Sequence, residues 1–284
     1  MTSFTYHAPS TLETTFDLLE RYGVDARLMA GGTDLLVRIR TGRFAPNVII
    51  DIKHVADLNA RIALTADQVE IGSLALMADL QSDPVIKRYF PALVEAASSV
   101  GSVQIRNRAT LAGNLCNASP AADTAPSLLI YGACVKLSSR KGLRILPLDQ
   151  FILGPGKTAL QLGELVRSVV IPLPADGQAA TFERLTRRKG VDLATVNVCC
   201  QVFESGLVRF AVGAAGPVPF IVEEAESQLV DPALDSMIKK QILNDLMSAA
   251  APISDVRASR EYRQAMLVVL ARRALERSLE RLNS

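Results

Sequence analysis

The sequence predicts a mixed α+β fold made of an α/β region, a β-rich middle and a helical C-terminus. Three observations lead to this prediction. Short apolar segments of strand character alternate with segments of helical periodicity as far as residue 133. Strand-like segments then follow one another between residues 134 and 215. From Pro217 onward, apolar residues recur at helical intervals.

The N-terminal part begins with a predicted helix over residues 9–23. Ser10 and Glu13 have the spacing of a capping box at its start, and Gly23 is placed to end it. The elements that follow are predicted from their apolar patterns. Strands are expected at residues 26–30, 47–52 and 68–73, and helices at residues 74–84 and 90–101.

A short predicted helix over residues 124–133 leads into the β-rich middle. Two later strands are separated by the tripeptide Glu204–Gly206, which predicts a hairpin. In the final helix, Met266, Val269 and Leu270 form an apolar stripe beside Arg273. Strands are expected at residues 134–139, 143–149, 165–172, 181–186, 195–203 and 208–215, and helices at residues 221–230, 236–252 and 259–282.

The composition is that of a globular protein with a sizeable core, because 49% of the 284 residues are hydrophobic and 21% are charged. The 31 basic and 29 acidic residues nearly cancel, which argues against a nucleic-acid or anionic-membrane partner. No segment approaches the roughly 18 uninterrupted apolar residues of a membrane span, and the N-terminus lacks the pattern of a secretory signal. We therefore expect no membrane span and a cytoplasmic location.

The four cysteines lack the spacing of a metal site. No two of them form a Cys-x-x-Cys pair, and the two histidines lie far apart in the sequence. Cys199 and Cys200 are neighbours in an alternating apolar segment, so their side chains should point to opposite faces. We expect buried apolar cysteines, and neither an iron–sulfur cluster nor zinc held by this chain.

The segment Leu28–Arg40 places two adjacent glycines between a strand and a helix. Gly31 and Gly32 permit backbone torsions that other residues resist, and they leave no side chain to block a ligand. Successive N–H groups in such a turn form an anion-binding concavity, to which Thr33 adds a hydroxyl. Asp34 argues against a bare anion site unless it caps the following helix or faces away, and the helical pattern that begins there fits a cap. Plain strand connections also have this pattern, and the spacing is neither Gly-x-Gly-x-x-Gly nor a Walker motif.

The segment Arg108–Asp123 is a second loop rich in small residues. Gly113, between Ala112 and Asn114, allows close approach of the backbone to a ligand. Long irregular segments inside a compact domain are usually functional. The polar side chains suited to a phosphate and a polyhydroxy chain are Thr110, Asn114, Ser119 and Asp123.

These two loops resemble the FAD-binding medium subunit of molybdenum-containing hydroxylases, the family of xanthine dehydrogenase and carbon monoxide dehydrogenase. The segments that carry the resemblance are "AGGTDLL", "TLAGNL" and "ASPAAD". It continues in order along nearly the whole chain, through "GSVQIRN", "GPGKT", "GELVRSVVIP", "RRKGVDLATVNV", "VGAAGPVP" and "APISDVRASREYR".

The resemblance implies a vanillyl-alcohol-oxidase-type FAD-binding fold of two α/β lobes, followed by a C-terminal domain with a three-stranded antiparallel sheet and helices. The FAD-binding domain would span residues 1–175, with a small lobe of about 1–55 and a larger lobe of about 56–175. Residues 176–284 would form the C-terminal domain. The sequence itself predicts breaks near Pro46 and over residues 173–181, a polar stretch with Pro and Gly.

The resemblance also implies which residues contact FAD. The two loops would wrap the pyrophosphate, and Thr33 would lie near the flavin ring. The implied residues are Met29, Ala30, Gly31, Gly32, Thr33, Asp34 and Leu35 from the first segment, Thr110, Ala112, Gly113 and Asn114 from the second, and Gly101 from the motif "GSVQIRN".

Further implied contacts surround the flavin and its hydroxyl chain. Cys116 would lie beside the isoalloxazine, and Leu165 or Val166 would pack on the ring. Asp123 would bind hydroxyls of the ribityl or ribose part. A cation would approach the pyrimidine end and stabilise the anionic reduced flavin, and the candidates for this role are Arg184 and Lys189.

Some positions depart from the family pattern. Ala112 replaces the first Gly of a Thr-x-Gly-Gly-Asn motif, and its one extra methyl group makes the approach tighter but feasible. Val103 replaces a Pro and Ala109 a Gly in the segment before it. The cysteine-rich loop of the 4-hydroxybenzoyl-CoA reductase type has no counterpart in this sequence.

The function that the resemblance implies is electron transfer within an oxidoreductase. A molybdopterin large subunit would hydroxylate the substrate, and [2Fe-2S] clusters on a small subunit would pass the electrons to FAD in this chain, which would deliver them to NAD⁺ or another acceptor. Two alternatives are a stand-alone flavin oxidoreductase of the same fold and a flavin-free scaffold subunit. The sequence shows no Ser–His–Asp set and no metal-ligand cluster that would favour other chemistry.

Overall fold

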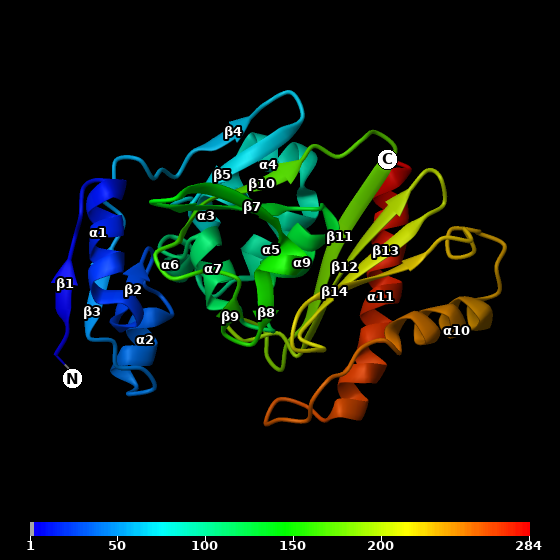
Figure 1. The fold of residues 1–284 in the computed structure, drawn as a ribbon. Coiled ribbons are helices and arrows are strands. Elements are labelled where there is room, and N and C mark those ends of the chain that lie inside the picture. Colours follow the sequence, from blue (N-terminus) through cyan, green and yellow to red (C-terminus); the bar gives the residue numbers. More distant parts are fainter. Residues whose placement is uncertain (1–2) are drawn as a thin grey trace.

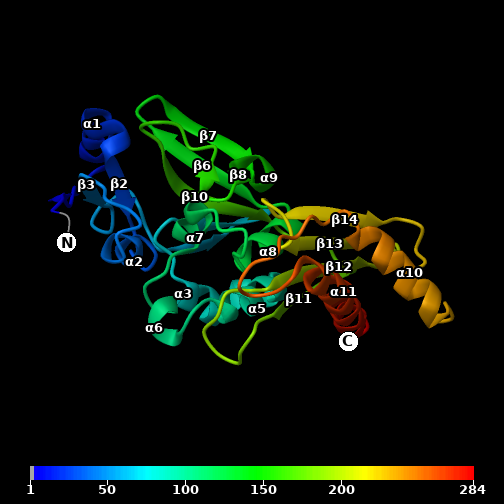
Figure 2. The same cartoon turned by 90° about the horizontal axis from the view of Figure 1, so that it is seen from below.

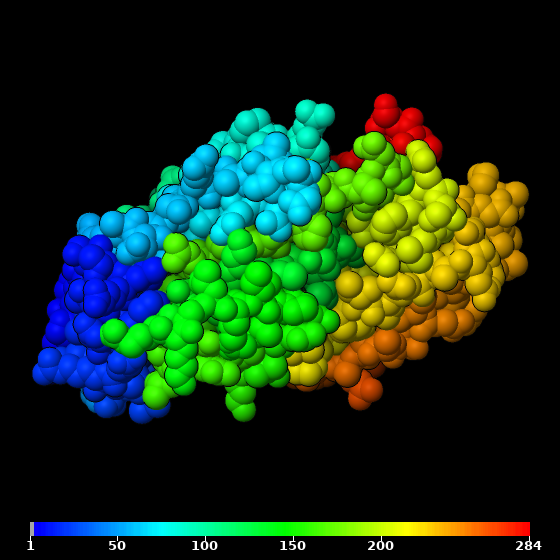
Figure 3. Space-filling view, turned by 45° about the horizontal axis from the view of Figure 1, so that its top comes forward, coloured from blue at the N-terminus to red at the C-terminus, as the bar shows by residue number. Residues whose placement is uncertain are grey.

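The computed structural model describes residues 3–284. Three parts follow one another along an elongated molecule in the order of the sequence (Figures 1 and 3). An N-terminal lobe (blue) lies at one end, a central lobe (cyan to green) in the middle, and a C-terminal part (yellow to red) at the other end.

The N-terminal lobe is a small parallel sheet with helices. Its elements are β1 (Thr5–His7), α1 (Leu12–Tyr22), a 3-10 turn (Gly23–Asp25), β2 (Ala26–Met29), α2 (Leu35–Arg40) and β3 (Val48–Asp51). The strands pair in the order β1–β3–β2, and both pairings are parallel. Phe16 and Leu19 of α1 are buried with Ile50 of β3, so the helix covers one face of this sheet.

The first helix ends at Gly23 as the sequence predicts, but its N-cap lies one residue later than expected. Gly23 follows its last turn with a φ of 50°, a left-handed torsion that favours glycine. The capping residue is Thr11, whose side chain accepts a hydrogen bond from the Thr14 N–H at 3.2 Å. The predicted cap at Ser10 is therefore wrong, because two hydroxyl residues are adjacent and the spacing alone did not separate them.

The central lobe is built on a five-stranded antiparallel sheet. Its elements are β4 (Ile62–Leu64), β5 (Gln68–Gly72), α3 (Met77–Ser82), α4 (Pro84–Tyr89), α5 (Pro91–Ser99), α6 (Val103–Arg106), α7 (Leu111–Asn117), α8 (Thr124–Ile130), β6 (Cys134–Ser139), β7 (Gly142–Pro147), α9 (Leu148–Phe151), β8 (Ile152–Gly154), β9 (Lys157–Thr158) and β10 (Leu165–Pro172). The sheet order is β4–β5–β10–β6–β7, and β8 and β9 form a separate hairpin. Figure 2 shows α3 and α5 on one side of this lobe and β6 and β7 on the other.

The C-terminal part is a four-stranded antiparallel sheet backed by a long helix. Its elements are β11 (Gln178–Leu185), β12 (Val196–Phe203), β13 (Val208–Gly213), β14 (Phe220–Glu224), α10 (Ser236–Met247) and α11 (Arg260–Leu282). The turn after Phe203 joins β12 to β13 as a hairpin, which confirms that prediction. One sheet face packs on α11, and the other packs on the central lobe. Cys199 lies in the core shared with the central lobe and Cys200 in the core under α11, so the prediction of opposite faces is confirmed.

The sheet has four strands where three were expected. The fourth, β14, lies in the segment predicted as a helix over residues 221–230. Phe220 pairs with Val212 in an antiparallel ladder, and Phe220 and Val222 pack on the core under α11. This short segment contains several good helix formers, but its apolar residues show no clear helical or strand period. Pairing with the open edge of β13 therefore decided that it forms a strand.

The buried stripe of α11 also differs from the prediction. Met266 and Val269 are half-buried and Arg273 is exposed. The helix contacts the sheet through a broader face that mixes large apolar residues, a buried arginine and small residues, and Leu270 of the predicted stripe belongs to it. The buried residues are Arg263, Leu267, Val268, Leu270, Ala271, Ala274, Leu275 and Ser278.

Candidate functional site

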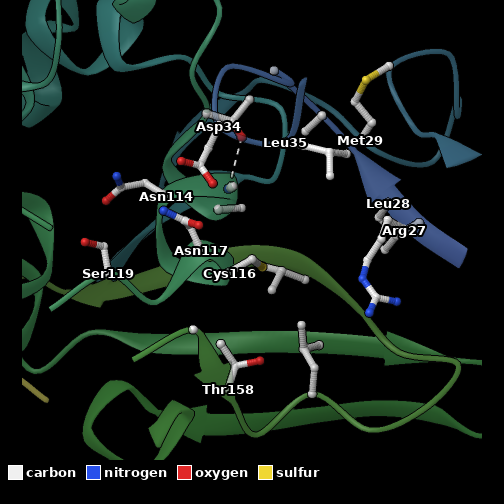
Figure 4. Close-up of a pocket in the computed structure, with 18 of the residues that line it drawn as sticks. Arg27, Leu28, Met29, Asp34, Leu35, Asn114, Cys116, Asn117, Ser119 and Thr158 are labelled. Atoms are coloured by element: carbon white, nitrogen blue, oxygen red, sulfur yellow. Dashed lines mark hydrogen bonds between the residues drawn. The ribbon is translucent and has the colours of Figure 1, made fainter. Parts of the chain in front are cut away.

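A cleft of about 1080 Å³ separates the N-terminal lobe from the central lobe. The turn after β2 forms one wall and the segment around α7 forms the opposite wall. The β8–β9 hairpin and the start of β10 complete it, as Figure 4 shows for Thr158 below Cys116 and Asn117. Small-molecule sites usually have about 300 to 1,000 Å³, so this cleft suits a large, extended ligand.

The two glycines after β2 serve different purposes. A Cβ atom on Gly31 would lie 1.9 Å from the carbonyl oxygen of Arg108, so the two loops touch backbone to backbone at this point. Gly32 has a φ of 70°, a torsion that other residues rarely adopt. The first glycine is needed for contact between the loops and the second for the direction of the chain.

The turn presents unpaired hydrogen-bond donors to the cleft. Within residues 3–284, the backbone N–H groups of Gly31, Gly32, Thr33 and Asp34 donate to no protein acceptor, and all four residues line the cleft. None of the four residues is buried, so these donors are open to a ligand in the cleft. Successive free N–H groups in such a turn suit an anionic ligand.

Asp34 does not cap α2 with its side chain. It occupies the N-cap position, but its backbone is already helical, with φ −97° and ψ −47°, and the side chain makes no capping hydrogen bond. The carboxylate is 53% exposed and lies 3.9 Å from Arg38 one turn later. The cap expected from the sequence is therefore wrong, because a helical backbone turns the side chain away from the N–H groups that it would bind.

The second wall is not the irregular loop expected from the sequence, because its residues Leu111–Asn117 form α7, and hydrogen bonds within the segment hold it. The Thr110 hydroxyl accepts from the Gly113 N–H at 3.0 Å and caps α7. A Cβ atom on Gly113 would lie 2.7 Å from that hydroxyl, so a glycine is required there. The buried Thr124 hydroxyl donates to Asn114 Oδ1 at 2.7 Å, which orients the amide at the edge of the cleft. Ala112 is accommodated and nearly buried.

The inner wall of the cleft is apolar. Leu165 and Val166 at the start of β10 are buried and line it, together with the half-buried Cys116. Burial raises the pKa of the Cys116 thiol to about 12, so it stays protonated at neutral pH. These side chains offer a flat aromatic ligand an uncharged contact surface.

Asp123 forms a buried cluster at the far end of the same wall. Its carboxylate accepts a hydrogen bond from Arg184 at 2.6 Å and one from the Asn197 amide at 3.0 Å. Burial raises the pKa of Asp123, while Arg184 and Asn197 favour the charged form. Asp123 lines the cleft, whereas Arg184 lies behind it.

Two domain descriptions match this sequence. Residues 2–174 match the FAD binding domain in molybdopterin dehydrogenase, and residues 180–278 match the CO dehydrogenase flavoprotein C-terminal domain. The chain belongs to this family of flavoproteins.

Curated relatives and solved structures agree with the domain matches. The chain is 31% identical to the putative xanthine dehydrogenase FAD-binding subunit of Escherichia coli over 279 residues, which cover 96% of this chain and 95% of the relative. It is 31% identical to the carbon monoxide dehydrogenase medium chain of Afipia carboxidovorans over 283 residues, 98% of each. A chain of carbon monoxide dehydrogenase from Hydrogenophaga pseudoflava superposes with a TM-score of 0.90 at 29% identity, with 98% of each chain covered. A chain of quinoline 2-oxidoreductase from Pseudomonas putida 86 gives a TM-score of 0.91 at 26% identity and 99% coverage of each.

FAD is the cofactor of this family, and the cleft of this flavoprotein fits it. The row of free N–H groups suits the pyrophosphate, and Cβ atoms at Gly31 or Gly113 would displace the cradle. The apolar inner wall suits the isoalloxazine. Of the residues predicted from the sequence to contact FAD, all line the cleft except Arg184 and Lys189. Lys189 is exposed in the loop between β11 and β12.

Sequence reasoning missed a third wall of the cleft. The β8–β9 hairpin contributes Lys157 and Thr158, and the residues from Leu160 to Glu164 follow it. The motifs "GPGKT" and "GELVRSVVIP" include part of this segment, but no residue in it was predicted to contact FAD. Arg27 and Arg38 lie with their guanidinium carbons 5.0 and 5.4 Å from the Phe44 ring centroid at the outer end of the cleft. No signal in the sequence joined these three residues, since cation–π contacts have no fixed spacing.

Residues 3–284 contain neither a candidate metal cluster nor a candidate membrane-spanning helix. No group of three or more His, Cys, Asp or Glu side chains in this range is placed to hold a metal ion. None of the helices in the same range has the length and hydropathy needed to cross a bilayer.

Proposed function

We propose that this chain is the FAD-binding electron-transfer subunit of a cytoplasmic molybdenum hydroxylase. Its FAD would receive electrons from [2Fe-2S] clusters on a small partner subunit, after a molybdopterin large subunit has oxidised the substrate. NAD⁺ or another acceptor would take the electrons away. The observation that carries this proposal is the pair of loops that meet at Gly31 and Arg108 and present a row of free N–H groups to the cleft.

The cofactor supplies the redox chemistry, since bound flavin can exchange electrons singly or in pairs. The protein supplies position and electrostatics. We propose that the N–H groups from Gly31 to Asp34 hold the pyrophosphate from one side. The first turn of α7, capped by Thr110, would hold it from the other side. Asn114, already oriented by Thr124, would donate its free amide group.

We propose that the inner wall sets the environment of the isoalloxazine. Cys116, Leu165 and Val166 would pack on the ring and keep water from it. Asp123 would accept from a hydroxyl of the cofactor, because each carboxylate oxygen retains a second lone pair. Of the two cations considered for the pyrimidine end, the geometry favours Arg184, because Asp123 holds it at 2.6 Å next to the cleft.

We also propose that the N-terminal and C-terminal parts of the sequence have different functions. Residues 1–175 would bind FAD, through a small lobe of about 1–55 and a larger lobe of about 56–175, and residues 176–284 would support that site. Asp192 and Leu193, in the loop between β11 and β12, reach the cleft from the C-terminal part. This part therefore contributes directly to the entrance of the cleft.

A tagged chain purified from its native cells tests this function. We expect a [2Fe-2S] protein and a molybdopterin protein to co-purify with it in fixed proportion. Anaerobic NADH should bleach the visible flavin band of the assembly if NAD⁺ is the acceptor. Reduction by an artificial donor but not by NADH would assign a different acceptor. A yellow chain that purifies alone and turns over a substrate would instead indicate a stand-alone oxidoreductase.

A further inference from the structure

A lysine outside the cleft lining contacts the glycine turn. Lys53 follows β3, and its Nζ atom lies 3.4 Å from the carbonyl oxygen of Ala30. Ala30 and Gly31 line the cleft, whereas Lys53 does not. The ammonium group therefore contacts the turn without lining the cleft.

A buried carboxylate fixes the position of this lysine. Asp51 Oδ2 accepts from Lys53 Nζ at 2.5 Å and from the Tyr6 hydroxyl at 2.5 Å, and Oδ1 accepts from the Lys53 N–H at 3.1 Å. The Asp51 side chain is only 3% exposed and that of Lys53 30%. Burial raises the pKa of Asp51, but the hydrogen bonds from Lys53 and Tyr6 outweigh it and leave the pKa below its ordinary value. The carboxylate is thus ionised at neutral pH and holds the ammonium in place.

The geometry of a trans peptide connects this lysine to the cleft. The structure contains no cis peptide bond among its described residues, so the Ala30 carbonyl and the Gly31 N–H point in opposite directions. With the carbonyl directed at Lys53, the Gly31 N–H points away from it, and this N–H finds no acceptor within residues 3–284. The Ile52 N–H also donates to the Met29 carbonyl at 3.0 Å, which fixes the residue before the turn.

We propose that Lys53 is a positioning residue for the FAD site. It orients the Ala30–Gly31 peptide so that the N–H faces the pyrophosphate. Asp51 and Tyr6 hold the lysine in that position. This assignment rests on the proposed role of the turn as the pyrophosphate cradle.

Binding measurements on the full-length apoprotein test the assignment. Lys53→Met should weaken binding of FAD and of ADP, which contains the pyrophosphate, by about tenfold, or about 1.4 kcal/mol. Riboflavin lacks the pyrophosphate and should bind as it does to the wild type. Lys53→Arg should recover part of the loss, and Lys53→Gln serves as a second neutral variant if Lys53→Met does not fold. Lys87→Met removes the same charge from the exposed surface of α4 and should change none of these affinities.

Three outcomes would overturn the assignment. Wild-type affinity of both neutral variants for FAD and ADP would show that the lysine does not position the turn. Equal weakening for riboflavin and ADP, with a lower Tm of the apoprotein, would show a purely structural role. A wild-type apoprotein that binds neither FAD nor ADP would overturn the proposed cradle itself, and the wild-type measurement separates this case from the first two.

Discussion

At the scale of single residues, the turn at Gly31 could be predicted from the sequence, but its contact with Arg108 could not. The adjacent glycines indicate a turn that leaves room for a ligand, and both line the cleft. The stronger constraint on Gly31 is the Arg108 carbonyl, which comes from a distant part of the chain. A single sequence does not show which segments meet, so this contact was not predicted.

Gly31→Ala should abolish retention of FAD. The added methyl group would lie 1.9 Å from the Arg108 oxygen, so the two loops would have to separate. We expect at least a hundredfold loss of affinity, of the order of 3 kcal/mol, measured by flavin fluorescence on addition of FAD to the apoprotein.

Gly216→Ala is the matched control. Its backbone is not left-handed, and a Cβ atom there would meet its nearest neighbour at an ordinary 3.5 Å. This variant should bind FAD as the wild type does. Wild-type affinity in Gly31→Ala would mean that the loops can part without harm and that the cradle is not formed as described.

At the scale of elements, α11 is held by a buried charge that periodicity did not predict. Arg263 is 2% exposed and donates to the carbonyl oxygens of Thr195 and Ala214 at 2.6 and 3.3 Å. It also donates to Asp255 at 2.6 Å, which Arg257 contacts as well. Apolar periodicity assigns an arginine to the surface, which is why the predicted stripe included Leu270 and Met266 but not Arg263.

Arg263→Met should destabilise the C-terminal part by about 3 kcal/mol, because it leaves buried carbonyl groups without a donor. Urea unfolding followed by circular dichroism measures this difference. Arg272→Met, at an exposed position on the same helix, should change the unfolding free energy by less than about 0.5 kcal/mol. Equal effects of the two substitutions would contradict the role given to Arg263.

The same cluster predicts a dependence on pH. Burial raises the pKa of Asp255, but hydrogen bonds from Arg257 and Arg263 outweigh it and hold the pKa far below its ordinary value. The cluster therefore contributes stability above the unfolded-state pKa of about 4, and loses it as the pH falls toward the folded-state value. Asp255→Asn should remove this contribution, so its unfolding free energy should fall less than that of the wild type between about pH 6 and pH 3. Parallel pH profiles would contradict the assignment.

At the scale of the whole molecule, a carboxylate on the central lobe joins it to the C-terminal helix. Glu95 of α5 accepts hydrogen bonds from Arg277 and Arg281 of α11, both at 2.7 Å, and from the Phe182 N–H of β11 at 2.8 Å. The sequence predicted the succession of α/β, β-rich and helical regions. It did not predict β14 or this junction, because strand edges and ion pairs between distant segments depend on tertiary contacts.

Glu95→Gln should weaken that junction. With the side chain 24% exposed, we expect a loss of about 2 kcal/mol in unfolding free energy and a broader transition, as the two parts begin to unfold separately. Differential scanning calorimetry detects both changes. Glu276→Gln removes a carboxylate from an exposed pair on α11 and should leave the transition unchanged. A sharp, unshifted transition in Glu95→Gln would show that the apolar interface alone joins the two parts.

The cleft between the lobes supports one central claim, that this chain holds FAD. Its visible absorption spectrum, with mass analysis of the cofactor released on denaturation, tests this claim most directly. We predict a yellow protein that releases FAD at about one per chain, as expected for a single cleft lined by both loops. A colourless chain that also fails to take up added FAD would contradict the account.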